Sequence, residues 1–377
     1  MIIPKEHPGT WQDFKKRKDN QTLPITELTN KYKKELLLFE DFVSSQRLNQ
    51  LMVEQEISPG GGVEVFTSKT QLQKAMNQWY TRQSSAEARY GPIENWDVSR
   101  VTSFADVVGA ENPFFDPFSS YQTTYSTFNR DLSGWDVSNG TDFQFMFFEC
   151  LAYNNAGVSL SSWDVSKATN LSGMFSVNDA FEGIGLDSWN VSSATNLSVM
   201  FASATVFNTN INSWNTSNVT NMKGVFETTP AYNQPLNNWD VSKVTTMQEM
   251  FSCQVDGGIF NQPLSSWDTS NVINMSFMFN GAESFNQDIS NFDFSSVVPI
   301  SGFSAQRFLG IVSGGTDTST AMSVANYSTL LISIASQTLN EFVLFDAGDT
   351  QYSAGAAATA RATIISTPWA ISDGGQV

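Results

Sequence analysis

Residues 214–226 of this chain read WNTSNVTNMKGVF and residues 239–251 read WDVSKVTTMQEMF, so one pattern recurs after 25 residues. The pattern opens with the tetrapeptide W-[DN]-[VT]-S, and a degenerate copy, FDFS, begins at Phe292. The tetrapeptide begins at Trp96, Trp135, Trp163, Trp189, Trp214, Trp239 and Trp267. Intervals are 25–28 residues, apart from a first interval of 39. Self-similarity at a nearly fixed period predicts a repeat architecture with these tryptophans in its core.

Two spacings within each copy predict its local structure. Trp239 and Val241 are two residues apart, as on one face of a short strand. Met247, Met250 and Phe251 recur at i, i+3 and i+4, which favours a short helical segment facing inward. No single unit can bury its own aromatic side chains, so neighbouring units must stack. We therefore expect a leucine-rich-repeat-like solenoid with one short strand and one short helical segment per rung of about 25 residues.

The pattern divides the chain into five parts. Residues 1–58 precede the repeats and are expected to form an N-terminal helical anchor or assembly segment. Residues 59–62, Pro-Gly-Gly-Gly, are expected to form a hinge. Residues 63–95 are expected to form a helical cap, residues 96–305 an eight-rung solenoid, and residues 306–377 a mixed α/β C-terminal cap.

The repeat unit SWDVSxVTxMxxMFxxAxxFNQ closely resembles the unit of the BspA-like leucine-rich-repeat family of bacterial surface proteins and lipoproteins. Residues 65–104 are similar to the opening of that family, and residues 326–375 are similar to a module that closes such repeats. The resemblance implies a solenoid fold and a role in surface display or adhesion. It implies no catalytic residues.

Charge and hydropathy argue against several classes of partner. The net charge is −17, and residues 1–60 are neutral overall, so the excess of acidic groups lies in the rest of the chain. An acidic body repels a phosphate backbone, so we expect no nucleic acid partner. No stretch reaches the roughly 20 apolar residues of a transmembrane segment. The N-terminal stretch MIIPKEHPGTWQDF does not contain the apolar core of a classical signal peptide.

The residues that carry catalysis or bind metals are sparse. His7 is the only histidine, which argues against a catalytic triad or a multi-histidine metal site in the repeats. Cys150 and Cys253 lie four units apart, or about 19 Å along a stack, so we expect two free, buried thiols. We expect no catalytic residue, no metal ligand and no cofactor, and therefore no enzyme.

The second residue of the tetrapeptide forms a ladder of carboxylates and amides, which we name the corner ladder. Its members are Asp97, Asp136, Asp164, Asn190, Asn215, Asp240, Asp268 and Asp293. The ladder is either a row of calcium sites or a turn device in which each side-chain oxygen accepts a backbone N–H. The amide at two positions favours the turn device, because a turn tolerates an amide whereas a cation site loses charge.

Two segments outside the regular repeat are candidates for partner binding. The anchor candidates are Trp11, Phe14, Leu36, Phe39, Phe42, Val43, Leu48 and Leu51. They either dock on another protein or fold back onto the first rung. The long first interval carries a candidate binding loop with Phe114, Phe115, Phe118, Tyr121 and Tyr125. This loop either binds a partner or covers the edge of the first rung.

These features together favour a non-enzymatic display or adhesion protein. We expect protein partners in a larger assembly through residues 1–58, and a host-surface protein or a glycan on the solenoid. The expected location is the surface of a virus or phage particle. The alternatives are a free or cell-surface bacterial adhesin and, with less support, a carbohydrate-active enzyme.

Overall fold

The computed structural model describes residues 64–109, 125–253, 257–298, 306–307, 322–340, 343–367 and 369–377. The chain forms two compact units, Met1–Gly60 and Gly61–Val377, so the boundary falls in the glycine-rich segment 59–62. All described residues belong to the second unit. The anchor candidates from Trp11 to Leu51, together with Phe114, Phe115, Phe118 and Tyr121, lie outside the described residues.

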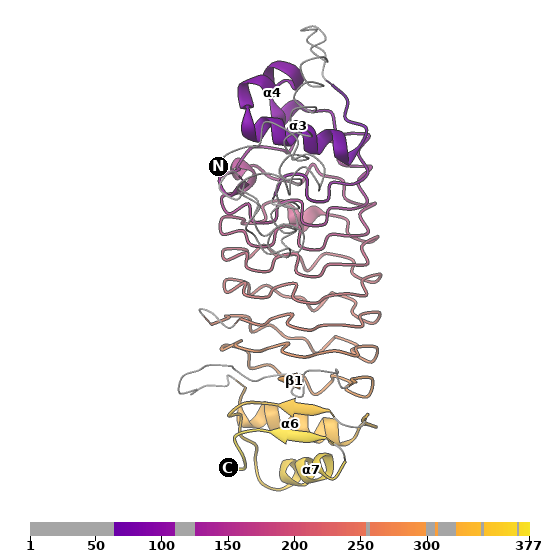
Figure 1. Cartoon of the computed structure of the whole chain (residues 1–377). Helices are drawn as coiled ribbons and strands as arrows, with labels where there is room; N and C mark the ends of the chain where they lie inside the picture. Colours follow the sequence, from indigo (N-terminus) through magenta and orange to yellow (C-terminus); the bar gives the residue numbers. More distant parts are fainter. Residues whose placement is uncertain are drawn as a thin grey trace, which may run out of the picture. The chain divides into compact units, whose positions relative to one another are not determined.

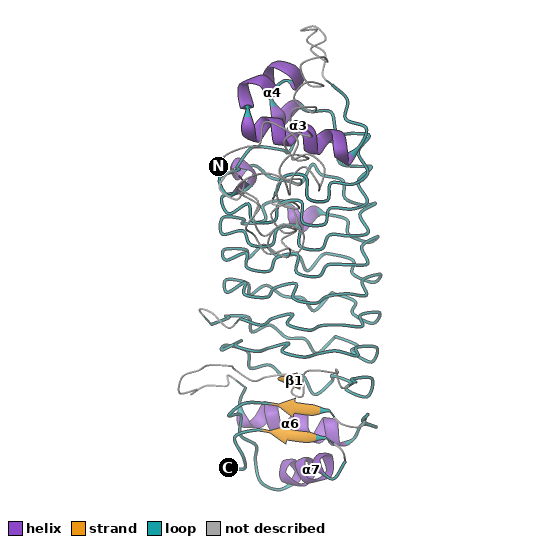
Figure 2. Ribbon diagram, viewed as in Figure 1, coloured by secondary structure: helices purple, strands orange, loops and turns teal. Residues whose placement is uncertain are grey.

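Successive repeats stack on one another in the second unit (Figure 1). One residue of each repeat forms an isolated parallel bridge with its counterpart in the next. The bridges join Ser103 to Asp142, Asp142 to Asn170, Asn170 to Asn196, Asn196 to Asn221, Asn221 to Thr246 and Thr246 to Asn274, and a further bridge joins Val65, before the first repeat, to Asp97. Figure 2 shows that the repeats otherwise consist of loops and turns, with short helical pieces among the first of them. The strand expected at Trp239–Val241 does not form; the bridge residue lies seven residues after each repeat tryptophan, as Thr246 does after Trp239.

The expected helical segment is wrong, because the Met–Phe stretch forms turns. The N–H groups of Met247, Glu249 and Phe251 donate to Asn274, Ser276 and Met278 of the next repeat, at 2.8–2.9 Å. An α-helix would direct these donors to carbonyls four residues earlier in the same segment. Glu249 is left-handed, with φ 60°, as are the equivalent residues of other repeats. The stretch therefore turns tightly while its apolar side chains still point inward.

Among the described residues, three 3₁₀ turns lie just before the first repeat or within the next repeats. They are η2 (Ile93–Asn95), η3 (Asn155–Gly157) and η4 (Leu186–Ser188). Both η2 and η4 end immediately before a repeat tryptophan, so they set the direction in which that side chain enters the core.

The core consists of aromatic columns that run from repeat to repeat. The seven repeat tryptophans are 2–4% exposed. Trp163 and Trp189 stack with ring centroids 6.2 Å apart. The Trp189 Nε1 donates to the carbonyl of Leu160 in the preceding repeat, at 3.0 Å. Each tryptophan thus fills the core and also satisfies a buried carbonyl of its neighbour.

Phenylalanine and tyrosine form further columns, in which hydroxyl groups have different environments. Tyr153 and Tyr232 each stack at 4.0 Å on a phenylalanine of their own repeat. The hydroxyl of Tyr153 donates to Asn155 Oδ1 at 3.2 Å. The hydroxyl of Tyr232 is buried and finds no hydrogen-bond partner among the described residues.

Removing these two hydroxyl groups is expected to have opposite effects. Tyr232→Phe raises the free energy of unfolding by about 1 kcal/mol, because a buried polar group without a partner carries its desolvation cost uncompensated. Tyr153→Phe lowers the free energy of unfolding by about 1 kcal/mol, because it removes a hydrogen bond from the same column. Urea denaturation of both variants measures the difference, and equal losses in the two would contradict these assignments.

Two helices, α3 (Lys69–Thr81) and α4 (Gln83–Tyr90), cover the first repeat. Ser68 caps α3 by accepting the Gln71 N–H, and the helix buries Leu72, Ala75 and Met76. Gln73 Nε2 donates to the carbonyl of Asp106, at 3.2 Å. The first repeat therefore receives apolar cover and a side-chain donor where a preceding repeat would otherwise lie.

A mixed module follows the last repeat. It contains α6 (Val324–Ala335) and α7 (Ala356–Ile365). Three short parallel strands, in the order β1 (Gln306–Arg307), β2 (Leu344–Asp346) and β3 (Ala370–Ser372), form its sheet. Within it, Arg361 donates to the buried carboxylate of Asp373 at 2.8 Å, and Tyr327 donates to the same carboxylate at 3.0 Å.

Helix α6 makes bonds to the last repeats that a further repeat would make. Asn326 Nδ2 donates to both the carbonyl and the Oδ1 of Asn286, at 3.0 Å. In the preceding pair of repeats, Gln287 Nε2 donates to the carbonyl and the Oδ1 of Asn261, at 3.0 and 2.8 Å. The helix therefore ends the stack by replacing one repeat's polar contacts with its own.

Candidate binding surface

The corner ladder consists of turns that are closed by side chains. Each of its eight members accepts, through Oδ1, the backbone N–H of the serine two residues later, at 2.8–3.1 Å. Asn190 and Asn215 make the same bond as the aspartates. These are the bonds that the turn interpretation requires. Among the described residues, no group of three or more His, Cys, Asp or Glu side chains is placed to share a metal ion.

Hydrogen bonds lower the pKa of three aspartates in this ladder. For Asp97, Asp164 and Asp240, the main cause is the hydroxyl of the serine two residues later, followed by the backbone N–H of that serine. A neighbouring Arg or Lys three residues later lowers the pKa further. These carboxylates are therefore held in the charged form, which suits a structural acceptor and does not suit a general acid.

Acid is expected to destabilise the protein through these groups. Because each folded-state pKa lies below the ordinary value of 3.8, the contribution is present above that pH and is lost as the pH falls through the lower folded values. The melting temperature should therefore drop below about pH 4. Replacing Asp97, Asp164 and Asp240 by asparagine should make this drop smaller, since an amide can still close the turn. An unchanged acid profile in the triple variant would contradict this assignment.

A row of exposed threonines runs along the stack, and we name it the threonine column. Its members are Thr102, Thr141, Thr169, Thr195, Thr220 and Thr245, and the exposed Ile273 and Val298 extend it. Thr220 donates to the carbonyl of Thr195 through its backbone N–H at 2.9 Å and through Oγ1 at 3.2 Å. The same hydroxyl bond recurs at all five steps between the six threonines. The threonine side chains are therefore fixed in one orientation.

A second row, two residues before each threonine, is fixed in the same way. Asn218 Nδ2 donates to the carbonyl of Ser192 at 2.9 Å, and Lys243 Nζ donates to Asn218 Oδ1 at 2.8 Å. Lys167 makes the equivalent bond to Asn139 at 2.7 Å. Side chains that are mobile on most surfaces are here tied to the preceding repeat, so binding would cost little of their conformational entropy.

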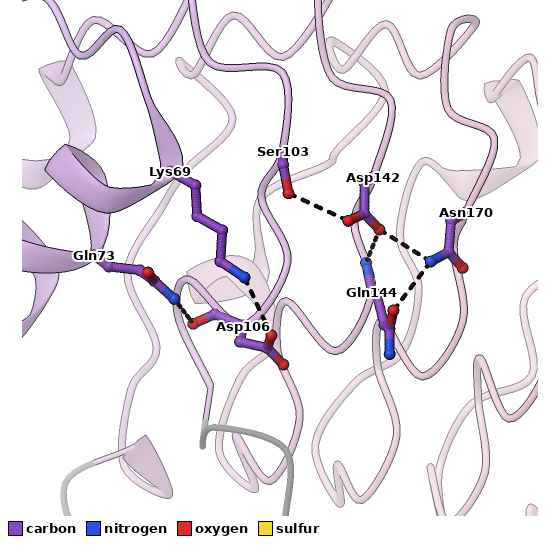
Figure 3. A network of polar contacts seen from close by, with 7 residues as sticks. All are labelled: Lys69, Gln73, Ser103, Asp106, Asp142, Gln144 and Asn170. Carbon is purple, nitrogen blue, oxygen red and sulfur yellow. Dashed lines mark hydrogen bonds and ion pairs between the residues drawn. The ribbon is translucent and has the colours of Figure 1, made fainter. Parts of the chain in front are cut away.

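A half-buried polar network lies beside the threonine column at the start of the stack (Figure 3). Asp142 accepts the Ser103 hydroxyl at 3.2 Å and the Asn170 amide at 3.0 Å. The Asn170 amide also donates to Gln144 Oε1, at 3.2 Å. Figure 3 shows Lys69 of α3 reaching Asp106 beside this network, at 3.3 Å. The network thus joins successive repeats, and an adjacent ion pair joins the capping helix to the first of them.

Another row consists of amides at the Phe-Asn or Tyr-Asn position of the repeats. Asn233 donates its backbone N–H to Asn208 Oδ1 at 3.0 Å, and Asn261 donates to Asn233 Oδ1 at 2.9 Å. Gln262 Nε2 donates to Asn233 Oδ1 as well, at 2.9 Å. This row bonds neighbouring repeats and leaves amide groups at the surface.

The predicted core tryptophans and Tyr125, the one described residue of the candidate binding loop, are all buried. Trp96, Trp135, Trp163, Trp189, Trp214, Trp239 and Trp267 are all buried and present no ring to a ligand. Tyr125 is also buried, with its ring centroid 4.7 Å from that of Tyr80 in α3.

Cys150 and Cys253 are both buried and free, and burial raises the pKa of the Cys150 thiol. None of the helices in the described part of the chain is long and apolar enough to cross a membrane.

Sequence reasoning missed the threonine column and the amide row as surfaces. Both recur in the unit SxWDVSxVTxMxxMFxxAxxFNQxL, as the T of VT and the N of FN. Their recurrence was visible, but it does not show which recurring residues face solvent. The structure shows that the apolar and tryptophan positions form the core, whereas these polar positions form in-register surface rows.

Comparison with protein families shows one match. The family described as "Mycoplasma protein of unknown function, DUF285" matches residues 63–182, 155–257 and 255–324. The comparisons with curated proteins and with solved structures found no match. The three matches together span residues 63–324, which is more than half of the chain. The chain therefore belongs to the DUF285 repeat family.

Proposed function

We propose that this chain is a BspA-like, leucine-rich-repeat-type solenoid that acts as a non-enzymatic binding or adhesion scaffold. Family membership and the stack of in-register repeats support the solenoid. The rows of fixed polar side chains support a role in binding. The scaffold would present these rows to a partner while the caps protect both ends of the stack.

The observation that carries the proposal is the order of the threonine column and its flanking row. Thr195, Thr220 and Thr245 are exposed, yet each hydroxyl donates to the repeat before it. Toward solvent, each threonine presents the lone pairs of its hydroxyl oxygen and its methyl group. A surface of this kind suits recognition by shape and hydrogen bonding. It contains no side chain poised for nucleophilic attack or proton transfer.

A protein partner fits this surface better than a glycan does. Sugar rings are commonly held on exposed aromatic faces, and the seven repeat tryptophans are buried. Three cations, Arg100, Lys167 and Lys243, lie beside the threonine column, each three residues after an aspartate. Asp136, Asp268 and Asp293 are followed at that position by an asparagine or a serine, so the face keeps a net negative charge, which would favour a partner with a complementary basic surface.

Binding of the purified chain to arrays of host-surface proteins and of glycans tests this proposal. We expect binding to a protein without hydrolysis of any glycan, and we expect Thr195→Glu with Thr220→Glu to abolish it. Ser265→Glu is the matched control, because Ser265 is exposed elsewhere on the stack. Hydrolysis of an arrayed glycan would favour the carbohydrate-active enzyme instead. Binding that survives the threonine substitutions would place the surface elsewhere.

The proposed setting is the surface of a virus or phage particle, with residues 1–58 as the anchor. The alternative is a free or cell-surface bacterial adhesin. Detection of the chain in purified particles supports the first setting. A chain that fractionates with the cell envelope, and not with particles, supports the second.

A further inference from the structure

The amide row carries hydrogen-bonding groups that the stack itself does not use. Asn233 Oδ1 accepts the Asn261 N–H and Gln262 Nε2, both at 2.9 Å. Asn208 Oδ1 accepts the equivalent pair from Asn233 and Gln234, at 3.0 and 3.2 Å. Within the described part of the chain, nothing accepts from the Nδ2 of Asn208 or Asn233, and nothing donates to the Oε1 of Gln262. These repeats therefore present amide N–H donors and amide acceptors in fixed positions.

An aliphatic row lies beside the amides of three successive repeats. Its members are Val206, Ala231 and Ile259. Each comes two residues before an asparagine of the amide row, and the aromatic ring between the two is buried. These rings, of Phe207, Tyr232 and Phe260, stack at 5.6 and 6.2 Å, so the rows are held in register. Because Val206 and Ile259 are 45% and 47% exposed, an apolar strip and a line of amides face solvent together.

This surface is uncharged, although the chain carries a net charge of −17. Residues 204–222, 228–239 and 257–267, which contain the aliphatic row and its three asparagines, include no Asp, Glu, Lys or Arg. The repeat before them has the exposed Glu182 in place of the asparagine, and the repeat after them has the exposed Glu283 three residues before its asparagine. The uncharged surface is therefore bounded along the stack. It offers no countercharge to an ionic ligand and favours a neutral one.

The hydrogen-bonding groups and their spacing define the ligand further. Amides that donate and accept on the same repeat match a compound that does both, as a sugar hydroxyl does. The aliphatic strip matches the C–H face of a sugar ring, which is apolar. A protein partner of this extent would bring charged side chains that find no opposite charge here. Since the groups recur at every repeat, about 4.8 Å apart, a polymer can engage several repeats at once.

We propose that the amide row and the aliphatic row together bind a neutral glycan chain that lies along the stack. The aromatic side chains of these three stretches are all buried, so a single sugar would bind weakly. The affinity would come from several repeats acting on one chain. Side chains that are already fixed lose little conformational entropy on binding. This surface shares no residue with the threonine column, so the inference adds a second binding surface to the proposed scaffold.

Affinity electrophoresis of the full chain tests the inference. The probes are native gels that each contain one neutral polysaccharide: soluble starch, a mixed-linkage β-glucan, a mannan or a galactan. We expect at least one of them to retard the chain. Isothermal titration with oligosaccharides of that glycan should then give an affinity about tenfold or more higher for six sugars than for two. The proposal is wrong if no polysaccharide retards the chain, or if two sugars bind as tightly as six.

Two substitutions on the surface test where the glycan binds. Asn233→Asp removes the free Nδ2 donors, adds a charge, and keeps an oxygen that can accept from Asn261 and Gln262. Ile259→Glu adds a charge to the aliphatic row at an exposed side chain, so it tests the surface even if Asn233→Asp does not fold. Each should weaken glycan binding about tenfold or more. Folded variants that bind as the unsubstituted chain does would overturn the proposal.

Asn190→Asp is the matched control, because it makes the same chemical change in the corner ladder, where aspartate occupies the equivalent position of other repeats. It should leave glycan binding unchanged. Thr195→Glu with Thr220→Glu should also leave it unchanged, so loss of the protein-binding surface and loss of the glycan-binding surface are distinguishable. If these variants weaken glycan binding as much as Asn233→Asp does, the amide row is not the site.

Discussion

Replacing Trp214 with alanine lowers the free energy of unfolding by about 3–5 kcal/mol. The side chain is 2% exposed, and its ring lies 6.3 Å from Trp239 and 6.2 Å from Phe201. Its Nε1 donates to the buried carbonyl of Leu186, at 2.7 Å. Alanine leaves a cavity between two repeats and removes the donor from that carbonyl. Urea denaturation monitored by far-UV circular dichroism, which does not depend on tryptophan fluorescence, measures the loss in the free energy of unfolding.

Trp214→Phe is the matched control for this substitution. Phe292 occupies the equivalent position of the last copy and is fully buried, so a phenyl ring fits the site. We expect a smaller loss of about 1–2 kcal/mol, due mainly to the missing N–H donor. A near-neutral Trp214→Ala variant would mean that tryptophan does not fill the space between repeats.

Replacing Gly185 with alanine lowers the free energy of unfolding by about 2–5 kcal/mol. Gly185 is left-handed, with φ 93°, and lies immediately before η4. A Cβ there would overlap Ser159 Oγ and lie 2.6 Å from the backbone nitrogen of Ser161. Both atoms belong to the preceding repeat, so relief would require two repeats to move apart. Thermal unfolding of the variant measures the combined effect of strain and overlap.

Gly157→Ala separates the strain from the overlap. Gly157 is also left-handed, with φ 78°, but no heavy atom lies within 4 Å of the position where its Cβ would be. It should therefore lose only about 1–2 kcal/mol, from the left-handed backbone alone. Equal losses at the two glycines would show that the repeats do not pack as closely as the structure places them.

Much of the fold follows from one recurring residue. Tryptophan at a nearly constant interval requires a stack, because a single copy cannot bury it. The DUF285 match over residues 63–324 agrees with a repeat structure. The predicted helical segment was wrong because the i, i+3, i+4 spacing of Met247, Met250 and Phe251 is compatible with a tight turn as well as with a helix. What distinguishes them is the destination of the backbone N–H groups, which bond to a repeat about 27 residues later.

The surface was harder to predict than the core. Apolar periodicity identifies the side chains that point inward, and it is silent about which polar residues form rows. The role of Asn326 in closing the stack shows the same difficulty. It replaces a repeat's glutamine from helix α6, which lies after the last repeat. The corner ladder was more tractable, because asparagine at two of its positions already pointed to a turn.

An in-phase deletion tests most directly the claim that each repeat is held by its neighbours in a regular stack. Removing residues 214–238 deletes one full copy and brings the copy at Trp189 against the copy at Trp239. We expect a folded protein that melts cooperatively, because Asn196 can then pair with Thr246 as Asn221 does now. Removing residues 214–225 deletes about half a copy and should prevent stacking. If the in-phase and out-of-phase deletions are equally disruptive, the repeats are not held by their neighbours in a regular stack.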